Sequence, residues 1–199
     1  MPWFAVLSLT SVLSVLTFFT QVAHPLVGLH AAGIPPDLRL LAFSMQALGV
    51  TAVALQTAVL MGLVLLAVRR FTLPPGAFSA ILGLNALAVA FLSREIFGRA
   101  GSLRLVPAAL VAGLLSDVLY ARLRSSPLGG RPLGLRLLAF GVPAIFYLLY
   151  FLTLIATTGI WWSIHLWLGS VVIAGLVGWL LSYVAAPPST GDVELPAWR

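Results

Sequence analysis

Six long apolar runs separated by short polar links dominate this sequence of 199 residues. A membrane-spanning helix needs about 20 mainly apolar residues, and each run meets or approaches that length. Strands of a membrane barrel would alternate polar and apolar residues, whereas these runs are apolar throughout, so each one is predicted to be helical. The predicted spans are Trp3–Ala23, Leu38–Val68, Pro75–Phe97, Leu103–Ala121, Leu135–Thr158 and Ile160–Val184.

The composition indicates lipid, and not water, as the solvent around most of the chain. Hydrophobic residues make up 61% of the sequence and charged residues only 8%, whereas soluble domains carry about a quarter charged residues. We therefore expect an all-α polytopic transmembrane bundle of six spans. Residues 1–186 should form a single domain, followed by a short cytoplasmic tail of residues 187–199.

The placement of arginine predicts the orientation of the bundle. Short cytoplasmic loops of membrane proteins are enriched in basic residues. Two of the links here are strongly basic, and their arginines are Arg69, Arg70, Arg122, Arg124, Arg131 and Arg136. These two links lie on the same side of a six-span bundle, and that side is cytoplasmic only if both termini are cytoplasmic (N-in/C-in). The arginines therefore predict this orientation in a multi-pass protein of the cell membrane, most simply the bacterial cytoplasmic membrane.

The net charge of +6 does not indicate nucleic-acid binding. The arginines lie at the ends of apolar runs, where they favour topology and contact with anionic headgroups, and no soluble basic segment exists to carry RNA or DNA. The expected partners are the lipid bilayer and other membrane subunits.

Catalytic signatures of soluble enzymes are absent from the sequence. The chain has no cysteine, which excludes thiolate metal sites and a cysteine nucleophile. It has none of the glycine-rich motifs that bind nucleotides. It also lacks the hydrolase motif GxSxG and the zinc-protease motif HExxH. We do not expect the isolated chain to be an enzyme.

The histidines give the first functional hypothesis. With the predicted topology, His24, His30, Glu95 and His165 all lie on the outer side of the membrane. Imidazole and carboxylate groups are ligands for Zn, Cu or non-haem Fe, and two imidazoles are the axial ligands of many haems. The hypothesis is a small membrane subunit that binds a metal ion or haem near its extracytoplasmic face. The alternative is that the histidines are ordinary loop and interface residues and that Glu95 pairs with a neighbouring arginine.

Polar residues at several depths give a second hypothesis, a transport component for a proton, an ion or a small solute. The path would consist of Gln21, Gln46, Gln56, Asn85 and Asp117. Asp117 is expected to pair with Arg122 or Arg124, or, if unpaired, to carry protons. The first span also has Thr10 and Ser14 on the same face as Gln21, which predicts that this face contacts protein.

Small residues at intervals of four give the third hypothesis, a structural subunit that docks a larger membrane complex. The last span has such a ridge at Ser170, Ala174, Gly178 and Ser182, and others lie in the second and fourth spans. Pro143 is expected to kink its helix and free the carbonyl of Ala139. The hexapeptide Leu38–Phe43 recurs unchanged at Leu135–Phe140, which indicates either an inverted repeat or a coincidence.

Overall fold

The computed structural model describes residues 2–22, 39–70, 72–97, 103, 106–128, 131–158 and 164–185. At some helix ends it describes the backbone alone, and these positions include Gln21, Gln46, Glu95 and His165. The predictions for His24, His30 and the tail of residues 187–199 concern positions outside the described residues.

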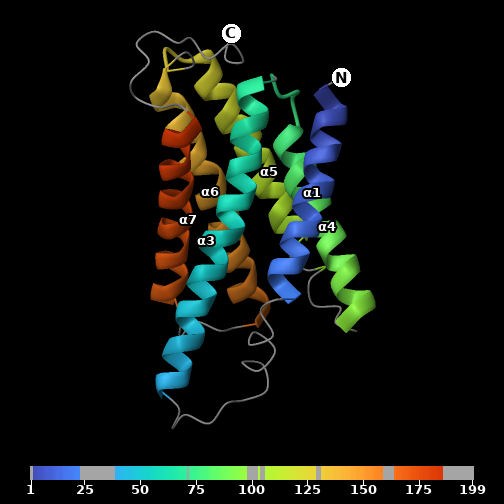
Figure 1. Cartoon of the computed structure of the whole chain (residues 1–199), viewed down its shortest axis with the longest axis vertical. Helices are drawn as coiled ribbons and strands as arrows, with labels where there is room; N and C mark the ends of the chain where they lie inside the picture. Colours follow the sequence, from blue (N-terminus) through green and yellow to red (C-terminus); the bar gives the residue numbers. More distant parts are fainter. Residues whose placement is uncertain are drawn as a thin grey trace.

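Six α-helices make up the regular structure of the described chain, as the apolar runs predict (Figure 1). They are α1 (Pro2–Val22), α3 (Arg39–Arg70), α4 (Ala77–Phe97), α5 (Val106–Ser125), α6 (Pro132–Thr158) and α7 (Ile164–Ala185). Each helix overlaps one of the six apolar runs, and its ends differ from the ends of that run by up to four residues.

Three of these helices, α5, α6 and α7, are long and apolar enough to cross a membrane. Among the described residues, the other three helices contribute shorter apolar stretches, which are Val6–Leu16, Val53–Val68 and Ala77–Leu92. The fourth predicted span, which is the shortest in the sequence, is therefore one of the three best candidates.

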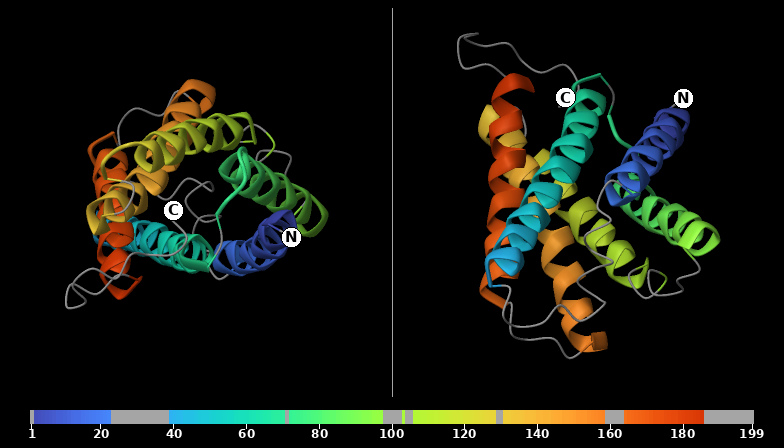
Figure 2. Two further views of the ribbon diagram at one scale, coloured as in Figure 1. Left: turned by 90° about the horizontal axis from the view of Figure 1, so that it is seen from above. Right: turned by 60° about the horizontal axis from the view of Figure 1, so that its bottom comes forward.

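The helices alternate in direction and form a ring (Figures 1 and 2). Each helix packs on two neighbours, in the order α1, α3, α7, α6, α5, α4 and back to α1, and α3 also contacts α6 across the ring. The antiparallel pair α6 and α7, which a short link joins, has the most extensive contact. The N-terminal end of α1 and the C-terminal end of α7 lie at the same end of the bundle.

The arginine-rich ends of the helices gather at that same end. Arg69 and Arg70 close α3, Arg122 and Arg124 lie in the last turn of α5, and α6 begins just after Arg131. We call this the arginine end of the bundle. The main apolar core lies toward it, formed by residues such as Val64 of α3, Phe78 of α4, Leu138 of α6 and Ala185 of α7.

Helix α7 has small residues inside and large ones outside, which is the arrangement expected where helices pack in lipid. The predicted ridge is buried, with Ser170, Ala174, Gly178 and Ser182 all turned inward. On another face, Leu168, Val172, Leu176 and Leu180 are 49–64% exposed. The small ridge is thus used within the chain, on α6 and α3, and is not left for a partner.

Helices α6 and α7 approach closely near the proline of α6. A Cβ added to Gly178 would overlap the carbonyl oxygen of Ala139 and lie 3.3 Å from Cγ of Pro143. Because Pro143 has no N–H, it cannot bond that carbonyl as the fourth residue after Ala139 normally would. The carbonyl of Ala139 faces the backbone of Gly178, and only a residue without a side chain leaves room for it there.

The two halves of the chain pack differently. In the first half α1 packs on both α3 and α4, whereas in the second half the middle helix, α6, packs on both of its neighbours. If an inverted repeat related α3 to α6, the three helices of each half would pack on one another in the same pairs. They do not, so the packing favours the interpretation that the repeated hexapeptide is a coincidence.

Candidate functional site

The first turn of α4 is capped by a side chain from α5. The carboxylate of Asp117 accepts hydrogen bonds from the backbone nitrogen of Phe78 at 2.9 Å and of Ser79 at 3.0 Å, and from the Ser79 hydroxyl at 2.6 Å. The N–H of Ala77 bonds the carbonyl of Pro74, and that of Ala80 bonds Gly76. All four N–H groups that open α4 are therefore satisfied, and the negative carboxylate lies at the positive end of the helix.

The chain itself creates the need for this external cap. The segment before α4 ends in Gly76, whose φ of 81° is the left-handed conformation that glycine tolerates, and it has no side chain to cap the helix. The cap is brought close by Gly113, one turn before Asp117 on α5. A Cβ on Gly113 would overlap the backbone of Ser79 and lie 2.8 Å from its nitrogen.

Neither sequence interpretation of Asp117 describes these bonds. The hydrogen bonds that hold its carboxylate come from α4, and the expected partners Arg122 and Arg124 are exposed further along α5. The carboxylate is partly buried and fully engaged, so its evident role is to join α4 to α5.

A second polar contact crosses the ring. The hydroxyl of Tyr147 on α6 donates a hydrogen bond to Oε1 of Gln56 on α3, at 3.0 Å. Tyr147 is 5% exposed and stands in an aromatic cluster with Phe146, Tyr150 and Phe151. Of the residues predicted to line a polar path, Gln56 is therefore inside the bundle and paired.

Two neutral polar atoms are enclosed without a good hydrogen bond. Thr57 is fully buried, and its hydroxyl lies beside that of Tyr147 without good bonding geometry. Asn85 on α4 is 8% exposed, and within the described part of the chain its Oδ1 has no donor. Such atoms are uncommon in folded proteins, because the desolvation cost is not repaid.

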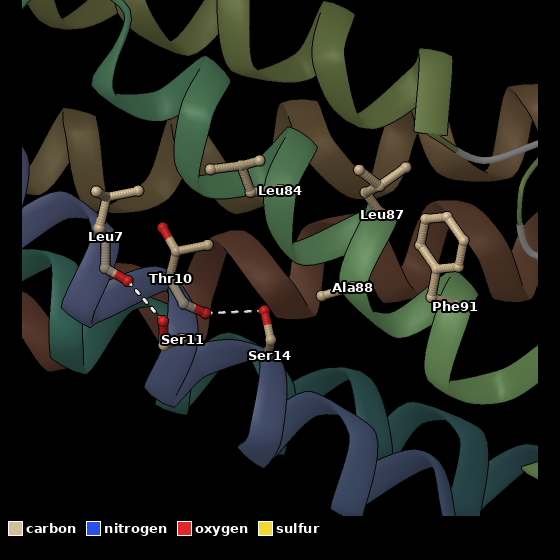
Figure 3. A pocket seen from close by; sticks show the side chains of 8 residues that line it. All are labelled: Leu7, Thr10, Ser11, Ser14, Leu84, Leu87, Ala88 and Phe91. Atoms are coloured by element: carbon tan, nitrogen blue, oxygen red, sulfur yellow. Dashed lines mark hydrogen bonds between the residues drawn. The ribbon is translucent and has the colours of Figure 1, made fainter. Parts of the chain in front are cut away.

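The hydroxyls of Thr10, Ser11 and Ser14 on α1 donate to carbonyls of their own helix, as Figure 3 shows for Ser11 and Ser14. Thr10 bonds the carbonyl of Val6 at 2.7 Å and Ser14 that of Thr10 at 2.8 Å, and both residues are buried as predicted. They line a mainly apolar pocket of about 290 Å³ between α1 and α4, closed on the other side by Leu84, Leu87, Ala88 and Phe91. At Thr10 and Ser14, the polar face of α1 therefore serves for packing against the neighbouring helices.

Two of the predicted metal ligands lie on described helices. Glu95 is near the C-terminal end of α4 and His165 near the start of α7, so both are at the end opposite the arginine end, as predicted. Their helices, however, stand across the ring from each other. Within the described residues no group of three His, Asp or Glu side chains gathers, and the metal site stays a prediction.

One arrangement at the arginine end was not singled out from the sequence. The guanidinium carbon of Arg136 lies 4.1 Å from the centre of the Tyr183 ring, which joins α6 to α7 by a cation–π contact. The sequence does contain a signal for this contact, because the arginine lies near the start of one helix and the tyrosine near the end of the next. The two residues can be paired only once the α6–α7 hairpin is known.

Comparison with protein-family models, with curated proteins and with solved structures found no match to this chain.

Proposed function

We propose that this chain is a six-span protein of the cell membrane with both termini in the cytoplasm, and that its bundle carries a small neutral polar solute across the bilayer. The membrane part of the proposal is supported by the three long apolar helices, the outward-facing leucines and valines, and the gathering of arginines at one end. That end would be cytoplasmic.

The transport part rests on the enclosed polar groups of the interior. From the arginine end, Gln56, Thr57 and Tyr147 are about 20 Å along their helices and Asn85 about 12 Å, at a rise of 1.5 Å per residue. These depths lie within a hydrocarbon core of about 30 Å. Polar groups are expensive there, so unsatisfied ones are candidates for function.

The kind of solute follows from the kind of side chain. The groups at this depth are amides and hydroxyls, which exchange hydrogen bonds with neutral polar molecules and carry no charge. The described carboxylate, Asp117, is already engaged in capping α4. A neutral solute therefore fits these groups better than a proton or a metal cation.

Flux into proteoliposomes tests the proposal, with urea and glycerol as probes read by stopped-flow light scattering. Asn85→Leu should abolish the protein-dependent flux, and because it replaces an enclosed unpaired amide with an apolar group, it should leave the thermal stability equal or higher. Ser11→Ala on the exposed face of α1 is the control. Equal flux in Asn85→Leu and Ser11→Ala, or no flux above empty liposomes, would reject transport of these solutes.

A metal or haem site remains a second proposal, favoured by the placement of Glu95 and His165 at the same end of the bundle. It predicts a stoichiometric metal or a Soret band in the purified protein that His165→Ala removes. Protein without either signal would exclude it.

A further inference from the structure

The guanidinium of Arg136 is held in place, and its Nε has no acceptor among the described residues. It stacks on the ring of Tyr183 at 4.1 Å, and its Nε is enclosed without a hydrogen-bond partner in the described structure. Arginine stacked in this way keeps its planar N–H edge for an anion, and a buried donor with no acceptor carries a desolvation cost. The arrangement therefore lacks an anionic or strongly accepting group.

The neighbouring charges do not supply that group. Arg131 lies five residues before Arg136, just ahead of the start of α6, and is exposed, and Arg122 is exposed at the end of α5. Among the described side chains the carboxylate at this end is that of Asp117, and it is bonded to the first turn of α4. The local potential around Arg136 is therefore positive.

The position of the pair matches the depth of lipid headgroups. Arg136 lies about 6 Å inside the start of α6, and Tyr183 about 3 Å inside the end of α7, at 1.5 Å per residue. Tyrosine and arginine are typical of this interfacial layer. Tyr183 is 37% exposed, so the pair stands at the outer edge of the α6–α7 contact and not in the core.

We propose that Arg136, positioned by Tyr183 and assisted by Arg131, binds a phosphate group at the arginine end of the bundle, and that an anionic lipid headgroup supplies it. A phosphate offers the planar pair of oxygens that an arginine fork accepts, and basic pockets between spanning helices on the cytoplasmic side bind lipid headgroups of this kind. The inference rests on the membrane placement proposed above but not on transport.

The test is native mass spectrometry of the full chain in detergent with added phosphatidylglycerol or, in parallel, phosphatidylcholine. Wild type should retain phosphatidylglycerol selectively. Arg136→Gln should weaken retention about fivefold, which corresponds to the loss of one arginine near a membrane surface. Tyr183→Leu should act in the same direction, whereas Tyr183→Phe keeps the ring and should behave as wild type.

Arg122→Gln is the matched control, because it removes the same charge from the same end on a different helix. Equal losses in Arg122→Gln and Arg136→Gln would overturn the proposal in favour of diffuse attraction. Displacement of the lipid by millimolar inorganic phosphate would contradict the proposal that a lipid headgroup supplies the phosphate. If Arg136→Gln does not purify as a folded monomer, Arg131→Gln, at an exposed position, must still reduce retention, and an unchanged value there also rejects the site.

Failure of this experiment is distinct from failure of the proposed function. The fractionation of the protein with membranes and its solute flux do not depend on Arg136. A protein that is membrane-bound and conducts urea but shows no lipid preference would contradict only the phosphate site.

Discussion

Asp117 and Ser79 are joined by two hydrogen bonds, one from the Ser79 backbone nitrogen at 3.0 Å and one from its hydroxyl at 2.6 Å, both to Oδ2 of the carboxylate. The serine is the third residue of α4 and the aspartate belongs to α5, so a capping interaction that is normally local becomes a tertiary contact here. Its loss should affect both the start of α4 and the α4–α5 contact.

Asp117→Ala should therefore destabilise the protein by about 1–2 kcal/mol, because it removes the cap and leaves two N–H groups of α4 without an acceptor. Asp117→Asn keeps one acceptor oxygen but loses the charge at the helix terminus and should cost less, roughly 0.5–1 kcal/mol. Thermal unfolding in detergent, compared with Ser125→Ala on the exposed end of α5, measures both.

Solute flux per folded molecule should be unchanged in Asp117→Asn, because the carboxylate is a structural cap. A loss of flux without a loss of stability would instead indicate that Asp117 lines the transport path.

Gly178→Ala and Gly113→Ala should each destabilise the bundle by about 1–3 kcal/mol, because the new methyl group overlaps backbone atoms that cannot move aside like a flexible side chain. The control is Gly62→Ala in α3, where an added Cβ meets nothing within 4 Å. Since alanine is the better helix former, that change should be neutral or stabilising by up to about 1 kcal/mol. Similar effects at all three glycines would contradict the close helix contacts described.

Tyr147→Phe should cost about 1 kcal/mol of stability, because the hydrogen bond across the ring to Gln56 is lost. Gln56→Leu in the same background should show coupling, so the double variant should be less destabilised than the sum of the single ones. Strict additivity in this cycle would mean that the two side chains do not interact.

The sequence predicts the helices well for a simple physical reason. A helix surrounded by lipid must be mainly apolar over about 20 residues, so a run such as Leu103–Ala121 is visible in the sequence even though it contains Asp117. The buried ridge around Gly178 was also predictable, since close packing in lipid selects small residues at intervals of four. The length of the link between α6 and α7 made their pairing predictable as well.

The partner of Asp117 was not predictable in the same way. Sequence proximity favoured Arg122 and Arg124, but the hydrogen bonds come from two backbone N–H groups and the Ser79 hydroxyl, nearly forty positions earlier in the chain. Every residue except proline has a backbone N–H, so the sequence does not mark these donors. One signal did exist. Helix α4 begins after Pro74, Pro75 and Gly76 without a capping side chain of its own, so an acceptor had to come from elsewhere.

The ring order has a consequence for biosynthesis. Helix α3 is made early, yet one of its two flanking neighbours is α7, which comes last among the described helices. Until α7 is made, the faces of α3 and α6 that it covers have no helix packed on them. A chain that stops before Ile164 therefore loses more than one helix, because α3 and α6 each lose a neighbour.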